Sequence, residues 1–161
     1  MTRIHERVPL AVYPLEAVPL LRAYFHTLVG PEGTAEIRLH LSLPNFVGHV
    51  GFALEHNVLA SMRESTDASG LNTAFAIAWR PEGGGPLPAL NGMLTTWADA
   101  DDERSYLDLD GSYEPPGSLP GALFDAAIGH RIAAATAHEF LIHLKIGRER
   151  LQAATAHSPT N

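Results

Sequence analysis

Apolar and polar residues alternate along much of the chain, and a period of two is typical of β-strands. The clearest example is the run from Ile37 to Leu43, in which every second residue is apolar. The glycine-rich segment 81–86 is typical of a hairpin connection, and short polar turns separate the other runs. An antiparallel meander is therefore expected. Its strands are predicted over residues 4–12, 37–43, 50–58 (with a kink or bulge near Asn57), 75–79, 90–96 and 107–113.

Two segments have the spacing of helices instead. Between Pro14 and Val29 apolar residues recur every three or four positions, and Pro19 predicts a break because proline donates no backbone hydrogen bond. A long second helix is expected from about Leu119 to Leu151, after the breaker at Pro115-Pro116-Gly117. At about 100° per residue, one broad apolar face of this helix comprises Leu123, Phe124, Ala127, Ala134, Ala135, Leu141 and Ile142.

The order strand, helix, meander and long helix predicts an α+β domain in which a curved antiparallel sheet grips the C-terminal helix. The length of 161 residues suits one such domain with a sizeable core. We expect residues 1–154 to form this domain and residues 155–161 to be a flexible tail.

The composition excludes several classes of function. The chain has no cysteine, which excludes disulfides, thiolate nucleophiles and cysteine-ligated metals. Its net charge is −7, Lys145 is its only lysine and its arginines are scattered, so we expect no nucleic-acid partner. No apolar run reaches the roughly 18 residues of a membrane span, and the N-terminus does not resemble a signal peptide. A cytoplasmic location is expected, and homodimerisation is left open.

Four segments carry a family resemblance: Trp79-Arg80-Pro81, residues 87–94, residues 107–117 and residues 125–133. They resemble the polyketide cyclase/START-like (SRPBCC) superfamily, whose helix-grip fold is shared with the Bet v 1 allergens, and uncharacterised bacterial members in particular. The motifs cover about residues 72–144. The resemblance implies a deep apolar cavity between the sheet and the long helix. Known roles in the superfamily include lipid or hormone binding, polyketide cyclisation, ring hydroxylation and chaperone regulation, and no catalytic motif transfers to this chain.

Two polar residues of the long helix are candidates for contacting a ligand. Arg131 and His138 are seven residues apart and project within about 20° of each other, near the centre of the predicted apolar face. A guanidinium and an imidazole there could orient a carboxylate or phenol. Alternatively, Arg131 pairs with Asp108 or Asp110 and His138 is a packed, hydrogen-bonded residue.

Aromatic residues of the strands are further candidates. Trp79, Tyr113, Phe75 and Phe52 are expected to point inward, where they line either a ligand cavity or an ordinary core.

Acidic and histidine clusters are less promising. Asp108 and Asp110 share one strand face, as an acid/base pair or, more simply, as a solvated face. His138 and His143 are spaced i, i+5, which separates their imidazoles by about 140° on a helix, so they cannot share a metal. We expect no metal and no cofactor. His40 alternates with apolar residues and is expected to face solvent.

The leading functional hypothesis is binding or carriage of a small apolar ligand in the cavity between the sheet and the C-terminal helix. A second hypothesis is a cyclase or lyase acting on an apolar carbonyl compound, with Arg131, His138 or Tyr113 providing polar catalysis. A third is a partner-binding module whose core is filled and holds no ligand.

Overall fold

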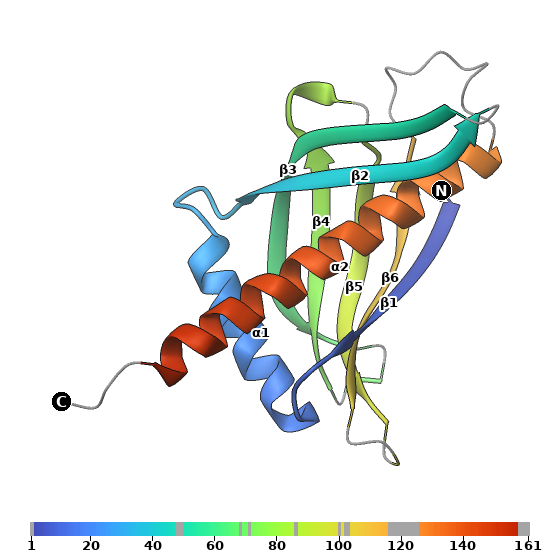
Figure 1. Ribbon diagram of the computed structural model, residues 1–161. Coiled ribbons are helices and arrows are strands. Elements are labelled where there is room, and N and C mark those ends of the chain that lie inside the picture. The colour runs from blue at the N-terminus through green and yellow to red at the C-terminus, as the bar shows by residue number, and fades with distance from the viewer. Residues whose placement is uncertain are drawn as a thin grey trace.

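A curled sheet of six antiparallel strands and a long C-terminal helix packed across its concave side make up the architecture (Figure 1). The computed structural model describes residues 2–47, 50–67, 69–70, 72–85, 87–99, 101, 104–115 and 126–157. Its elements are β1 (Thr2–Leu10), α1 (Pro14–Leu28), β2 (Ala35–Val47), β3 (Val50–Thr66), β4 (Thr73–Pro81), the short 3-10 turn η1 (Glu82–Gly84), β5 (Ala89–Ala98), β6 (Ser105–Glu114) and α2 (Ala126–Ala156).

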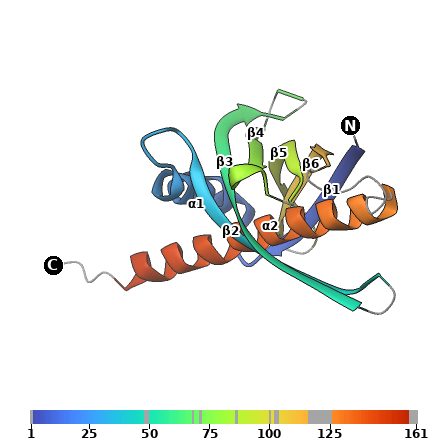
Figure 2. The same ribbon diagram turned by 90° about the horizontal axis from the view of Figure 1, so that it is seen from above.

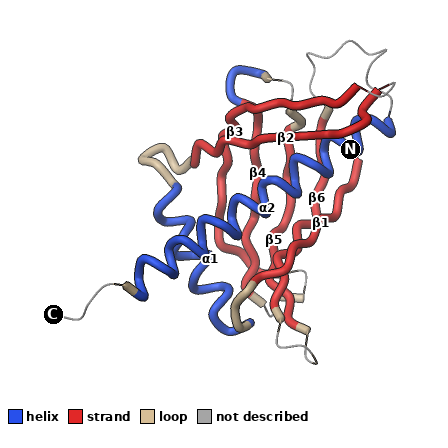
Figure 3. Tube along the Cα trace, in the orientation of Figure 1, coloured by secondary structure: helices blue, strands red, loops and turns tan. Residues whose placement is uncertain are grey.

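The strands form one sheet in the order β1-β6-β5-β4-β3-β2, which confirms the predicted antiparallel meander from β2 to β6. β1 completes the sheet by pairing with β6 (Figure 3). The sheet is curled into a half-barrel, and α2 contacts both of its edge strands, β1 and β2. Figure 2 shows the C-terminal half of α2 extending past the sheet, on the side where α1 lies.

The core lies between the concave face of the sheet and α2. Trp79, Phe75 and Tyr113 are all buried, which confirms that these three aromatic residues point inward. The Trp79 ring packs on Phe140 of α2, with 4.7 Å between ring centroids, so side chains fill the space at the middle of the helix. The side chain of Phe52 lies outside the described part of the chain.

A pair of glycines allows β5 and β6 to approach closely. Gly92 and Gly111 face each other across the two strands. A Cβ on Gly111 would lie 2.5 Å from the carbonyl oxygen of Asn91, and one on Gly92 would lie 2.7 Å from that of Asp110. Since these distances are shorter than any van der Waals contact, only glycine fits at either position.

Of two local predictions, the break at Pro19 was wrong and the kink near Asn57 was confirmed. α1 is one continuous helix through Pro19. The proline removes the hydrogen bond to the Leu15 carbonyl, but Leu15 is highly exposed, so water can satisfy that oxygen. The kink predicted near Asn57 is present, because β3 turns sharply where it leaves β2 and pairs with β4 (Figure 1), and the two pairings overlap at Val58–Ala60. β3 nevertheless continues as one strand to Thr66, and a shift in strand register lies between Leu43 and Val47 of β2.

The boundaries of α2 also differ from the predicted ones. The helix continues to Ala156, so it includes the first residues of the expected tail. Its predicted start at Leu119 and the breaker residues Pro116 and Gly117 lie outside the described residues. Among the helices of the described part of the chain, none is long and apolar enough to cross a membrane.

Candidate functional site

Arg131 and His138 do not face the sheet, which corrects the prediction from helical spacing. Both side chains are exposed, and Arg131 lies about 180° around the helix from the buried Phe140. His138 instead meets the rim of β1, with its Nδ1 3.6 Å from Oε2 of Glu6. Alanines occur all around α2, so they do not show which side of the helix is buried. The large residues Phe140 and Leu144 do lie on the buried side.

The alternative partner proposed for Arg131 is also wrong, because Asp108 is paired with residues of β1. Arg7 donates to Asp108 through its Nε at 2.9 Å and also through Nη2, and the His5 Nδ1 lies 3.3 Å from the same carboxylate. Arg7 also lies over the ring of Trp97 at 4.9 Å. Asp108 is therefore a nearly buried ion-pair residue on the outer face of the sheet, whereas Asp110 is solvated as expected.

The two histidines of the His138–His143 run contact different elements. His138 faces β1, whereas the Nε2 of His143 lies 3.4 Å from the Tyr24 hydroxyl of α1. Across the described residues, no group of three histidine or carboxylate side chains is arranged to hold a metal ion. His40 is exposed, as predicted.

Tyr24 and His143 form a half-buried contact between the two helices. Burial raises the pKa of the Tyr24 hydroxyl, and the charge of Arg150 opposes this shift. Burial lowers the pKa of His143, and Arg150 lowers it further. Both groups are therefore neutral at pH 7 and join the helices through a hydrogen bond without charge.

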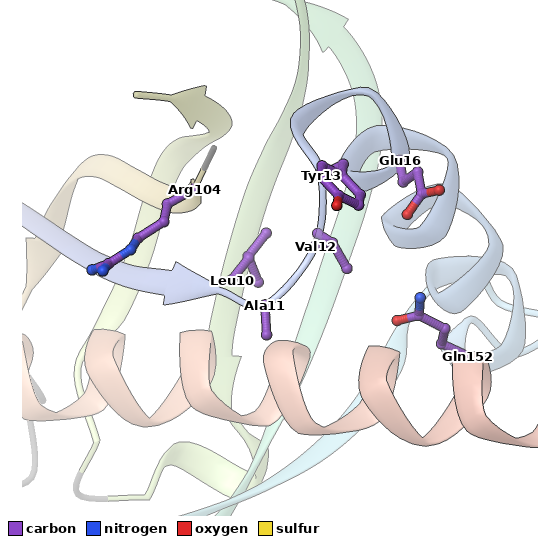
Figure 4. Close-up of a pocket in the computed structure, with 7 residues that line it drawn as sticks. All are labelled: Leu10, Ala11, Val12, Tyr13, Glu16, Arg104 and Gln152. Carbon is purple, nitrogen blue, oxygen red and sulfur yellow. The ribbon is translucent and has the colours of Figure 1, made fainter. Parts of the chain in front are cut away.

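A surface pocket lies where β1, α1 and the C-terminal part of α2 meet (Figure 4). We call it the junction pocket. Its volume is about 450 Å³. It is lined by Leu10, Ala11, Val12, Tyr13, Glu16, Arg104 and Gln152.

Local backbone structure holds the wall of the junction pocket in place. β1 ends at Leu10 and α1 begins at Pro14, and the short connection between them forms one side of the pocket. The buried Ser105 hydroxyl at the start of β6 donates a hydrogen bond of 2.8 Å to the Val12 carbonyl. At the other end of the connection, the amide of Glu16 donates to the Tyr13 carbonyl at 3.0 Å. The connection is thereby tied to both the sheet and the first turn of α1.

The junction pocket combines an apolar floor with polar groups. Leu10 and Val12 are buried and supply the floor. Glu16 projects from α1 and Gln152 from α2, as Figure 4 shows, and Arg104 comes from the segment before β6. A second hollow of about 340 Å³ along α1 shares Glu16 and Gln152 with the junction pocket. The two spaces therefore adjoin at these side chains.

Arg148 of α2 is a completely buried arginine on the core side of the helix. Its Nη1 donates to the Gln152 amide oxygen at 3.2 Å, and its Nη2 lies 3.5 Å from Oε1 of Glu149. Its Nε has no hydrogen-bond partner. Burial lowers the pKa of this guanidinium, although the negative charge of Glu149 opposes the shift. The guanidinium nevertheless stays charged, because arginine is not deprotonated in proteins.

Other hollows lie away from the junction pocket. One of about 230 Å³ between α1 and the sheet includes Phe25 and Phe75, and the ion pair between Arg22 and Glu64 (2.6 Å) stands beside it. Another of about 270 Å³ is on the outer face of β3, β4 and β5. Neither has a buried charge among its lining residues.

Comparison with solved structures finds distant similarity. No family model and no curated protein matches it. The crystal structure of TTHA0849 from Thermus thermophilus is similar over 95% of this chain and 99% of that one, at 12% identity and a TM-score of 0.47. At this low sequence identity and TM-score, the similarity carries no argument about a ligand or a reaction. The fold class therefore rests on the described structure: an α+β half-barrel with a long C-terminal helix packed against it.

Sequence reasoning missed both the junction pocket and Arg148. The pocket arises from three segments distant in the chain, and no local pattern marks such a meeting point. Arg148 did carry a signal, because it follows Leu141 and Leu144 by seven and four residues and precedes Leu151 by three. That spacing places a charge in a row of apolar residues.

Proposed function

We propose that the protein is a helix-grip binding protein that holds a small amphipathic ligand in the junction pocket. The observation that carries this proposal is the composition of the pocket, an apolar floor of Leu10 and Val12 beside the polar Glu16, Arg104 and Gln152. Ligand sites in proteins are typically hollows of about 300–1,000 Å³ with a few polar groups that fix orientation. The junction pocket, at about 450 Å³, has this size and this character.

The position of the pocket supports binding at the end of the half-barrel rather than under the middle of α2. Trp79 and Phe140 occupy the middle of the sheet–helix interface. The junction pocket instead lies where β1 gives way to α1 and α2 extends beyond the sheet (Figures 2 and 4). Burial of an apolar ligand surface there would contribute about 25 cal/mol per Å² before the entropic cost of binding.

Titration with the neutral fluorescent probe N-phenyl-1-naphthylamine tests the proposal. We expect saturable binding to the wild-type protein and at least a tenfold loss of affinity in Ala11→Trp, because the indole would fill the pocket from an exposed position. The matched control is Ala53→Trp, which adds the same indole at an exposed position of β3. Equal affinity in the two variants, or no binding of the neutral probe to the wild type, would overturn the proposal.

A further inference from the structure

Arg148 is poorly compensated for a buried charge. Charged groups in protein interiors are normally paired and hydrogen-bonded, because their removal from water is costly. Here the nearest carboxylate, on Glu149, is 41% exposed and at the 3.5 Å limit of hydrogen bonding. The better contact, at 3.2 Å, is with the neutral amide of Gln152, and the Nε has no partner. The fold thus holds a guanidinium with unused capacity for an anion.

Gln152 connects this guanidinium to the junction pocket. Its side chain contacts Nη1 of Arg148 and also lines the pocket. Gln152 is exposed, so its side chain can rotate into solvent without breaking core packing. Such a rotation would free the Nη1 of Arg148 for another acceptor.

We propose that Arg148 makes the junction pocket selective for ligands with an anionic head group, a carboxylate or a sulfonate on an apolar body. The inference rests on the proposed function. The head group takes the place of the Gln152 oxygen on Nη1 and accepts a second hydrogen bond from Nη2, whose contact with Glu149 is 3.5 Å long. Arginine binds such anions through two parallel N–H donors, and these charge-assisted hydrogen bonds are about twice as strong as neutral ones.

The proposed preference for anions depends on charges close to the pocket and not on the overall charge of the protein. The chain has a net charge of −7, so its overall field does not attract anions. Glu16 and Arg104 add opposite charges to the lining of the junction pocket, and both are exposed, so water screens their effect on a bound anion. The buried guanidinium of Arg148 is screened less, so the head group lies on the α2 side, next to Gln152 and Arg148, and the apolar body lies against Leu10 and Val12.

A matched pair of probes tests the inference. 8-Anilino-1-naphthalenesulfonate and N-phenyl-1-naphthylamine share one aromatic body and differ by the sulfonate. We expect the wild type to prefer the anionic probe by at least about tenfold. Arg148→Met should lose this preference while its affinity for the neutral probe changes less than about threefold. The control, Arg150→Met, removes the same charge from an exposed position two residues away and should keep the preference.

The outcomes separate this inference from the proposed function. If the neutral probe binds in a manner sensitive to Ala11→Trp but neither probe is preferred, selectivity by Arg148 is refuted and the proposed function stands. If Arg148→Met retains the preference, the inference is likewise refuted. Should Arg148→Met fail to fold, Gln152→Ala decides, because uncovering the guanidinium should strengthen binding of the anionic probe about threefold or more. An unchanged or weakened affinity in that variant overturns the inference.

Discussion

Removal of the Phe140 side chain is the strongest test of whether the space between the sheet and α2 is filled. Phe140 is completely buried, and its ring lies 4.7 Å from that of Trp79. Phe140→Ala should lower the free energy of unfolding by about 3–5 kcal/mol, the sum of lost transfer energy and the cavity left behind. This is a large share of the roughly 5–15 kcal/mol typical of a folded domain. Phe140→Leu, which keeps most of the volume, should cost only about 1–2 kcal/mol.

Urea unfolding followed by far-ultraviolet circular dichroism would measure these losses. An unchanged slope with denaturant would show that the loss reflects stability and not a change in the surface exposed on unfolding. The variant should also gain a site for benzene, since an apolar cavity of this kind stays dry and admits small apolar molecules. Ala11→Trp should not block that new site, because Ala11 lines the junction pocket and not the middle of the interface.

A loss below about 1 kcal/mol for Phe140→Ala would refute the packing argument. It would mean that Phe140 borders open space in solution and that a ligand cavity lies under α2, as the sequence predicts. The junction pocket would then be a secondary feature. The same experiment therefore decides between the two locations for a ligand.

Three further predictions concern the sheet and the helix contact. Gly111→Ala should lower the free energy of unfolding in urea by at least about 2 kcal/mol, because the new Cβ would clash with the backbone of the neighbouring strand. At Gly30 a Cβ would lie 3.5 Å from its nearest neighbour, so Gly30→Ala should be nearly neutral. Equal effects of the two changes would contradict this prediction. Asp108→Ala should lower the free energy of unfolding by about 1–3 kcal/mol, because it leaves Arg7 without its carboxylate partner. Asp110→Ala, at an exposed position, should lower it by about 0.5 kcal/mol or less. Similar losses in the two variants would exclude a special role for the buried ion pair. Since burial holds the pKa of His143 below its unfolded value of about 6.5, its contribution to stability is full above that pH and is lost as pH falls through the folded pKa. His143→Gln should flatten the measured loss of stability on acidification, and an unaltered pH profile would disprove the link.

The strands could be predicted from the sequence because the half-barrel buries only one face of each. In β2, apolar residues at every second position show directly which side chains point inward. The C-terminal half of β3 was missed because its pattern is polar from Arg63 to Thr66, where tertiary pairing with β4 overrides local preference.

The orientation of α2 could not be predicted in the same way. Alanine is small enough to lie on either face of a helix, so Ala134 and Ala135 gave no information about which side packs on the sheet. A prediction based mainly on the two large residues Phe140 and Leu144 would have rotated the predicted apolar face toward the observed one. Arg148 would then have been predicted to lie on the buried face. Arg131 would then have been expected on the outside, where the structure has it.

Two independent features coincide at the end of α2. One is geometric: the junction pocket lies where the helix extends past the sheet. The other is electrostatic: Arg148, which contacts the pocket-lining Gln152, is buried and has an unused donor. A purely structural position would favour an apolar residue, because replacing a poorly paired buried charge by a hydrophobic one is often stabilising. Arg148→Met should therefore raise or preserve stability while it removes anion preference. That combination is expected of a binding residue and not of a residue kept for the fold.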